Sequence, residues 1–141
     1  MRVSVVQNEK ELRDAFDVRF KVFVEEQNVP REEELDEHDE RAVHVVLYDE
    51  NMPVGTGRIR EADGYGKLER ICILEEYRGK GAGKMIMNEL ENIAAPNLPA
   101  FKLNAQTQAV PFYERLGYTV VSDEFMDAGI PHVTMTKKRL N

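Results

Sequence analysis

The stretch that decides the fold is Glu75-Glu76-Tyr77-Arg78-Gly79-Lys80-Gly81-Ala82-Gly83-Lys84. An apolar run typical of a strand precedes it, and a run with helical periodicity follows it. The three glycines allow successive backbone N–H groups to point into one concavity, at the positive end of the helix that begins near Ala82. Three cations add positive charge: Arg78, Lys80 and Lys84. The stretch therefore predicts an anion-binding turn between a strand and a helix, suited to a pyrophosphate.

Two better-known glycine signatures do not fit this stretch. A P-loop ending at Gly83-Lys84 would need Gly at position 78 and Ser or Thr at position 85, where the chain has Arg78 and Met85. A dinucleotide fingerprint starting at Gly79 would need Gly at position 84, which is Lys84. The pattern that remains is Arg-x-x-Gly-x-Gly, and a tight turn without a ligand stays open as its alternative.

The composition predicts one domain. At 141 residues and 42% hydrophobic content, the chain is long enough for one core and too short for two domains of ordinary size, so we expect a single domain over residues 1–141. The single cysteine, Cys72, excludes an internal disulfide framework. No apolar run approaches the ~20 residues that span a bilayer, and the N-terminus lacks the features of a secretion signal. We therefore expect a cytoplasmic protein without a membrane partner.

The chain is acidic, with 26 acidic and 19 basic residues and a net charge of −7. Such a surface repels nucleic acid and favours a cationic or amine substrate. The acidic residues are densest in residues 31–41, where we expect a solvated loop or a short surface helix, with a substrate-facing rim as the alternative. That run has no regular ligand spacing and the chain has only three histidines, so no metal site is expected.

Periodicity and turn residues predict the order strand, helix, three strands, helix, strand, helix and two strands. Asn8 should cap the first helix, with Glu11 completing a capping box, and that helix should run through Glu26. We expect strands at residues 1–6, 43–48, 53–60, 67–74, 100–105, 118–125 and 132–138, and later helices at 82–95 and 109–116, the last ended by Gly117. This order predicts an α/β fold in which helices cover both faces of one mixed, mostly antiparallel sheet.

A second motif is Ala109-Val110-Pro111-Phe112-Tyr113-Glu114-Arg115-Leu116-Gly117-Tyr118. It is similar to the Ala-x-x-x-Tyr-x-x-x-Gly-Phe/Tyr segment of the GNAT acetyltransferases, and residues 78–83 resemble the loop with which that family holds the pyrophosphate of acetyl-coenzyme A (acetyl-CoA). The order of elements also resembles the family's over essentially the full length. Residues 68–73, 103–108 and 128–132 look like its small bacterial branch, labelled YjcF- or ElaA-like. The resemblance implies a sheet splayed between its fourth and fifth strands.

The resemblance further implies an acetyl-CoA-dependent N-acetyltransferase that uses no metal. The acetyl group would move to a primary amine of an unidentified small molecule, or of a peptide, by direct attack on the thioester. A catalytically silent CoA-binding module that senses the cofactor or regulates a partner is the alternative. The protein would be a monomer or a homodimer.

Two residues are candidates for the proton transfers. Glu69 is the candidate base, acting through a water, because it lies on the strand leading to the turn with the same parity as Ile71 and Ile73. Its alternative is an ion pair with Arg58, Arg60 or Arg70. By resemblance, Tyr113 is the candidate acid for the leaving thiolate, and its alternative is a core tyrosine whose hydroxyl makes a hydrogen bond.

The resemblance also implies the cofactor and acceptor contacts. The pantetheine arm would meet backbone groups of Ile71, Cys72 and Ile73, and Cys72 is expected to be a buried hydrophobe rather than a nucleophile. The pyrophosphate would lie on Arg78, Gly79, Lys80, Gly81, Ala82, Gly83 and Lys84. Gln106 stands where many family members have Asn, so Asn104 is expected to share or replace its cofactor contact. The acceptor would meet Glu26, Asn104 and His132, with a purely structural role as the alternative for His132.

Overall fold

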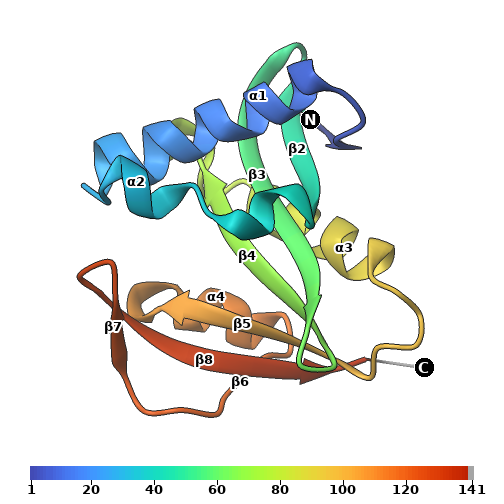
Figure 1. The fold of residues 1–141 in the computed structure, drawn as a ribbon, viewed down its shortest axis with the longest axis vertical. Coiled ribbons are helices and arrows are strands. Elements are labelled where there is room, and N and C mark those ends of the chain that lie inside the picture. Colours follow the sequence, from blue (N-terminus) through green and yellow to red (C-terminus); the bar gives the residue numbers. More distant parts are fainter. Residues whose placement is uncertain (140–141) are drawn as a thin grey trace.

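The computed structural model describes residues 1–139. Figure 1 shows one twisted sheet with helices on both faces, as the order of elements predicts. The strands are β1 Arg2–Val5, β2 Val43–Asp49, β3 Met52–Ala62, β4 Tyr65–Ile73, β5 Ala100–Gln106, β6 Thr119–Val120, β7 Phe125–Asp127 and β8 Ile130–Lys138. Their order is β1-β2-β3-β4-β5-β8-β6, with β7 paired to β8. Among these strands β4 and β5 form a parallel pair and every other pairing is antiparallel.

Helices α1 (Glu9–Arg19) and α3 (Ala82–Ile93) cover opposite faces of the first half of the sheet (Figure 1). The Asn8 side chain caps α1 by accepting a hydrogen bond from the backbone N–H of Glu11 at 2.8 Å, which confirms the predicted start. The Glu11 carboxylate accepts from the N–H of Gln7 at 2.9 Å, so the box closes one residue earlier than expected. No helix in the described part of the chain is both long and apolar enough to cross a membrane.

The first helix continues beyond α1 as a π-helical segment, η1 (Phe20–Glu26). Its end at Glu26 confirms the predicted boundary, and the backbone N–H of Gln27 closes the last wide turn by donating to the carbonyl of Val22 at 3.0 Å. The change of helix type was not apparent in the apolar spacing. The segment matters for the site, because three of its residues line a large cavity: Val22, Phe23 and Glu26.

A β-bulge in β4 opens the sheet. Arg70 has a φ of 56°, and the register of β4 against β3 shifts opposite it, between Thr56 and Arg58. Strand β4 pairs with β5 only from Gly66 to Leu68, and the two strands part beyond that point. Because a bulge bends its strand and increases the local twist, the splay between the fourth and fifth strands has a cause at Arg70.

The bulge makes the predicted parity of Glu69 wrong. A Cβ on Gly57 would touch the side chains of Ile71 and of Leu90 on α3, so Ile71 lies on the α3 face of the sheet. Arg58 follows Gly57 in β3 and therefore points to the opposite face, where it bonds Glu69. The extra residue of the bulge thus places Glu69 and Ile71 on opposite faces, and strict alternation along the sequence could not show this.

The acidic run is folded and partly solvated, with Glu32, Glu33, Glu37 and Glu40 exposed. It forms helix α2 (Arg31–Glu34) and a short 3-10 helix, η2 (Glu37–Glu40), on the α1 face. This agrees with the expected short surface helix, but three carboxylates turn inward to two buried arginines, Arg19 and Arg58: Glu34, Asp36 and Asp39. Arg19 is 1% exposed and Arg58 is 0% exposed. Buried guanidinium groups need such partners, so these contacts fix the segment on the protein.

The C-terminal part differs from the prediction in one place. A short 3-10 helix, η4 (Thr107–Ala109), leads into α4 (Val110–Arg115), which packs near β5 and is followed by Gly117 at a φ of 98°, as predicted. The strand predicted at residues 118–125 is instead divided into β6 and β7. Between them the Ser122 hydroxyl accepts a hydrogen bond from the backbone N–H of Thr134 at 2.8 Å, and this side-chain contact interrupts the backbone ladder.

Candidate active site

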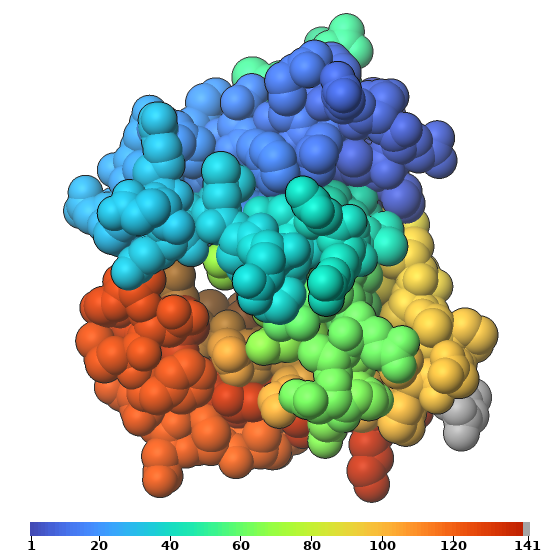
Figure 2. Space-filling view, viewed as in Figure 1, coloured from blue at the N-terminus to red at the C-terminus, as the bar shows by residue number. Residues whose placement is uncertain are grey.

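The parted strands border a cavity of about 740 Å³, which we call the main cavity. Its wall is formed by η1, by residues 67–73 of β4, by the glycine-rich turn, by the end of β5 and by α4. A smaller cavity of about 370 Å³ lies between the acidic segment (residues 31–40) and the β7–β8 hairpin. It shares six lining residues with the main one: Phe23, Gln27, Arg70, Gln106, Asp127 and His132. Figure 2 shows a hollow between these two parts of the surface, cyan-blue above and orange-red below.

The glycine-rich turn connects β4 to α3 through a short 3-10 helix, η3 (Glu75–Tyr77). Gly79 and Gly81 have φ values of 77° and 82°, which L-residues with a side chain adopt rarely. A Cβ on either would meet no atom within 4 Å, so the surface above this backbone is open. An open, left-handed backbone at the N-terminus of a 12-residue helix has the geometry of an anion-binding turn.

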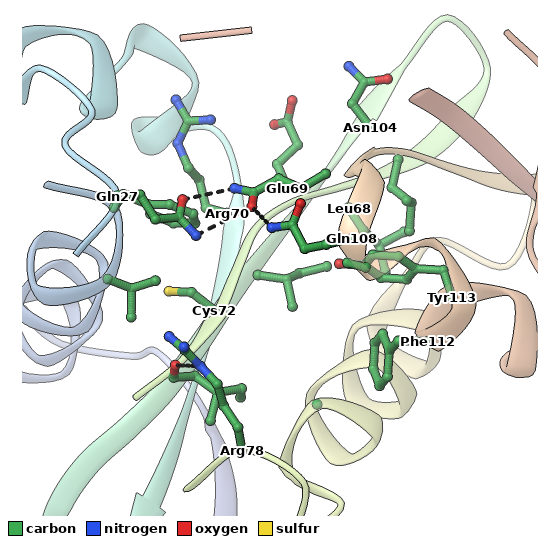
Figure 3. Close-up of a pocket in the computed structure, with 18 of the residues that line it drawn as sticks. Gln27, Leu68, Glu69, Arg70, Cys72, Arg78, Asn104, Gln108, Phe112 and Tyr113 are labelled. Atoms are coloured by element: carbon green, nitrogen blue, oxygen red, sulfur yellow. Dashed lines mark hydrogen bonds between the residues drawn. The ribbon is translucent and has the colours of Figure 1, made fainter. Parts of the chain in front are cut away.

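Glycine is needed at position 83 for a different reason from the one expected. A Cβ on Gly83 would lie 2.8 Å from the ring of Phe112, so Gly83 allows α4 to approach α3 closely (Figure 3). Of the three cations, Arg78 and Lys84 line the main cavity. Lys80 is not among the lining residues, and its Nζ lies 5.8 Å from the centre of the Tyr77 ring.

Arg78 crosses the end of the cavity to η1. Its two terminal nitrogens donate to the Glu26 carboxylate at 2.8 and 2.7 Å, and its Nε donates to the carbonyl of Ile73 at 2.9 Å. The hydrogen bond from Arg78 lowers the pKa of Glu26. Glu26, which was expected to contact the acceptor, is thus paired with Arg78, which was expected to contact the pyrophosphate.

The backbone of residues 71–73 is available on its β5 side, because the β4–β5 pairing stops at Leu68. Ile71, Cys72 and Ile73 all line the main cavity. Cys72 is buried, and this burial raises the pKa of its thiol, so it is protonated at neutral pH and behaves as the small hydrophobe expected from the sequence.

Tyr113 points from α4 into the main cavity (Figure 3). The residue is 8% exposed, and burial raises the pKa of its hydroxyl. No buried side-chain oxygen or nitrogen of the described residues lacks a partner, and no protein hydrogen bond is made by this hydroxyl, so the oxygen is open to the cavity. A core tyrosine would use its hydroxyl in a protein hydrogen bond, and Tyr113 does not.

Glu69 has the contacts of the ion-pair alternative. One carboxylate oxygen accepts from Arg60 at 2.8 Å and from Arg58 at 3.0 Å, and Lys67 lies 3.5 Å from the other. Burial alone would raise the pKa of Glu69, but the hydrogen bond from Arg60 and the charges of Arg58 and Lys67 lower it. The residue lines the main cavity on the α1 face, and its role as base stays a prediction.

Three glutamine side chains bridge η1 and β5 across the cavity. Gln27 and Gln106 exchange amide hydrogen bonds of 2.8 and 3.4 Å, and Gln108 donates to Gln106 (Figure 3). Gln106 is therefore engaged with protein groups. Asn104, two residues earlier in β5, accepts from the hydroxyl of Thr134 at 2.9 Å and also lines the cavity.

Sequence reasoning missed Gln27, Gln108 and Phe112. Gln27 lies just beyond a predicted helix and its partner is 79 residues away, so no local pattern indicated it. Gln108 lies in residues 103–108, which resemble the small bacterial branch of the GNAT family, but no role was predicted for it. Phe112 could have been found from the sequence. It lies in the second motif, and its ring needs a residue without a side chain opposite it, which is Gly83 of the three-glycine stretch.

A family model described as an acetyltransferase (GNAT) domain matches residues 8–139. The chain belongs to the GNAT acetyltransferase family. The N-acetyltransferase YjcF of Bacillus subtilis is 56% identical over 139 residues, which cover 97% of this chain and 99% of YjcF. The GNAT protein is therefore an enzyme, an N-acetyltransferase, as the resemblance implied.

Solved structures agree with the GNAT fold. A Lactobacillus plantarum protein described as an N-acetyltransferase has a TM-score of 0.90 and 28% identity, covering 99% of this chain and 98% of that one. Escherichia coli ElaA has a TM-score of 0.83 over 96% of this chain and 98% of its own, at 22% identity. An aminoglycoside 6'-N-acetyltransferase complexed with coenzyme A has a TM-score of 0.71 over 98% and 97%, at 15% identity. The last two comparisons support the fold alone.

The described residues of this GNAT enzyme contain no group of three or more His, Cys, Asp or Glu side chains arranged to hold a metal ion. Of the sequence-predicted site residues, the structure brings all but Lys80 to the main cavity: Glu26, Glu69, Ile71, Cys72, Ile73, Arg78, Gly79, Gly81, Ala82, Gly83, Lys84, Asn104, Gln106, Tyr113 and His132.

Proposed function

We propose that the enzyme moves the acetyl group of acetyl-CoA to a primary amine of a small molecule or a peptide, by direct attack of the amine on the thioester. The observation that carries this proposal is the parting of β4 and β5, because one cavity there joins the glycine-rich turn to Tyr113. Acetyl-CoA has a pyrophosphate in its middle and a thioester at its end, so it could place the first at the glycine-rich turn and the second near Tyr113. Among proteins that share the fold, the aminoglycoside 6'-N-acetyltransferase holds coenzyme A.

Acetyl-CoA would lie along the parted strands. Backbone N–H groups of residues 79–84, with Arg78 and Lys84, would hold the pyrophosphate at the N-terminus of α3. The pantetheine arm would pair with the open backbone edge of residues 71–73, and one N–H there would polarise the thioester carbonyl. Asn104 and Gln106 reach the same cavity from β5 and would meet the cofactor from the other side.

Tyr113 would protonate the sulfur as it leaves. Its hydroxyl is open to the cavity, and its raised pKa keeps it protonated and able to donate at neutral pH. The α4 helix that carries it lies beside α3, because the ring of its neighbour Phe112 faces Gly83 of α3.

The amine would enter from the α1 face, which we call the acceptor side. Glu69 lies there, and the smaller cavity opens there between residues of the acidic segment and of the β7–β8 hairpin. Three acidic residues, Glu33, Glu34 and Asp127, line this cavity against one arginine, Arg70, and apolar walls come from Phe23, Val29 and Ile130. Such a lining favours a cationic acceptor with an aliphatic or aromatic body. Glu26, Asn104 and His132 remain the proposed acceptor contacts.

Calorimetry with Gly81→Asp tests the cofactor site. The substitution puts a negative charge against the pyrophosphate, so acetyl-CoA affinity should fall by about 10²-fold or more. Gly64→Asp is a matched control, because Gly64 has a φ of 81°, also meets no atom within 4 Å of a Cβ, and lies outside both cavities. Equal affinity in the two variants would remove the pyrophosphate assignment.

A screen of primary amines that reads free thiol release tests the transfer itself. The GNAT enzyme should release coenzyme A thiol with at least one amine, at a rate above its hydrolysis of acetyl-CoA alone. Tight acetyl-CoA binding without acceptor-dependent thiol release across a broad panel would instead favour the CoA-sensing alternative.

A further inference from the structure

His132 has the geometry of a proton acceptor. Its side chain is 9% exposed, and it lines both cavities. Its Nδ1 lies 2.7 Å from the backbone carbonyl oxygen of Ile130. A carbonyl oxygen can only accept a hydrogen bond, so Nδ1 carries the proton. In the neutral ring, Nε2 therefore holds the free lone pair.

The Nε2 atom opens into cavity space. None of the hydrogen bonds and ion pairs of the described residues reaches it, while no buried side-chain nitrogen or oxygen among them lacks a partner. The ring plane is fixed by Phe125, which stacks on it with centroids 6.0 Å apart and an interplanar angle of 22°. A base that is oriented by a hydrogen bond on its other nitrogen and by stacking is prepared for proton transfer.

His132 also lies on the acceptor side. It lines the smaller cavity together with Glu33 and Glu34 of the acidic segment. His132 pairs in register with Gln106, whose side chain reaches η1 on the acceptor side. The amine would therefore meet His132 on one side of the sheet while the sulfur leaves towards Tyr113 on the other.

We propose that Nε2 of His132 is the general base that takes the proton from the acceptor amine. This inference rests on the proposed function. The competing carboxylate, Glu69, already accepts hydrogen bonds from Arg58 and Arg60, whereas Nε2 has no protein partner among the described residues.

The proton balance follows from the reaction. The ammonium ion gives one proton to Nε2, which returns it to solvent. The neutral nitrogen then bonds to the acetyl carbonyl carbon, the C–S bond breaks, and the sulfur keeps the electron pair. The thiolate takes a proton from Tyr113, and the second proton lost by the attacking nitrogen restores the tyrosine through solvent. One proton is released overall.

Nitrogen-15 NMR of the side chains tests the resting state without any substrate. The chain has three histidines, so the signals lost in His132→Gln identify His132. We expect the neutral form to carry its proton on Nδ1. A proton on Nε2 would make that atom a donor and overturn the proposal.

A pair of acceptors of equal size tests the base role in turnover. Ethylamine is almost fully protonated at pH 7, whereas methoxyamine is neutral, so only ethylamine needs the first proton transfer. His132→Gln should lower turnover of ethylamine by about 10²-fold and that of methoxyamine by less than about 3-fold. The control is His38→Gln, because His38 lines neither cavity and should leave both rates unchanged.

The outcomes separate this inference from the proposed function. Equal losses with both amines would mean that His132 only maintains the site, and no loss with either would remove it from the reaction. A wild type that binds acetyl-CoA yet acetylates neither amine, nor any other in the thiol-release screen, would contradict the proposed transfer and this inference with it.

Discussion

Arg58 and Glu69 form an ion pair inside the wall of the main cavity. The fully buried guanidinium donates to one Glu69 oxygen from Nε at 3.2 Å and from Nη2 at 3.0 Å, and from Nη1 to Asp36 and Asp39. The residue predicted as base is thereby tied to the acidic segment through one arginine. Mutations at either end of this contact should therefore be measured for stability as well as for turnover.

Glu69→Gln distinguishes a base from an ion-pair partner. If Glu69 takes the proton, turnover should fall by about 10²–10⁴-fold. If His132 takes it, as we propose, turnover per folded molecule should fall by less than about 10-fold, while the melting temperature decreases because Arg58 and Arg60 lose a carboxylate. Turnover and thermal unfolding measured on one preparation, beside His132→Gln, decide between the two residues.

Tyr113→Phe removes the open hydroxyl and keeps the ring. Turnover should fall by about 10–10³-fold, a moderate effect because a thiol with a pKa near 8.5 leaves readily as a thiolate. Acetyl-CoA affinity and melting temperature should change little, since the hydroxyl makes no protein hydrogen bond in the described structure. Full turnover, accompanied by a stability loss of about 1 kcal/mol, would instead assign the hydroxyl a structural role.

Glu26→Gln should increase acetyl-CoA affinity. The pyrophosphate and the Glu26 carboxylate would both attract Arg78, so removing the carboxylate frees the arginine for the cofactor and removes a negative charge from the site. We expect an increase of about 3–10-fold in calorimetry at low salt, smaller at high salt. Glu25→Gln changes the same charge one residue away and outside the cavity lining, and should have a weaker effect. A lower affinity in Glu26→Gln would show that the pair supports cofactor binding.

The acidic segment should make stability depend on pH. Burial alone would raise the pKa of Asp36, but hydrogen bonding to Arg58 and the charges of Arg58 and Arg70 lower it well below its ordinary value of 3.8. A carboxyl with a lowered folded-state pKa contributes stability that is fully present above its unfolded pKa and is lost as pH falls through the folded value. Asp36→Asn should therefore destabilise most at pH 6, and its difference from wild type should shrink below about pH 4. Urea unfolding at several pH values measures this, and a constant difference would contradict it.

Arg58→Ala provides the complementary stability test. It leaves three partly buried carboxylates without their shared guanidinium, so we expect a loss of about 3–5 kcal/mol in the free energy of unfolding. Arg41→Ala removes an arginine from the same region, and Arg41 makes no ion pair with the described residues. This control should cost less than about 0.5 kcal/mol.

The sequence was sufficient for those features that depend on local chemistry. Glycines in left-handed turns, an Asn cap and the spacing of apolar residues act within a few positions, so the turn at residues 78–84, the start of α1 and nearly all strands were predictable. The bulge at Arg70 was not, because a non-glycine residue at a φ of 56° is held there by tertiary contacts rather than by its own preference.

The inward turn of three carboxylates in the acidic run was hidden for the same reason. Glu34, Asp36 and Asp39 face Arg19 and Arg58, whose side chains lie on α1 and β3, and nothing local distinguishes an inward carboxylate from a solvated one. The tautomer of His132 was equally hidden, since it depends on the orientation of the Ile130 carbonyl in the folded hairpin.

The two borders of the smaller cavity differ in how many amino-acid substitutions they can tolerate. The acidic segment is fixed by buried arginines, so changes in its inward carboxylates would cost stability before they altered selectivity. The hairpin turn opposite has Ala128 and Gly129 at φ values of 51° and 75° and is not held by any ion pair of the described residues. Directed evolution towards new acceptors should therefore find tolerated diversity at positions 126 and 127, little at Gly129, whose left-handed φ disfavours a side chain, and few viable variants at positions 34, 36 and 39.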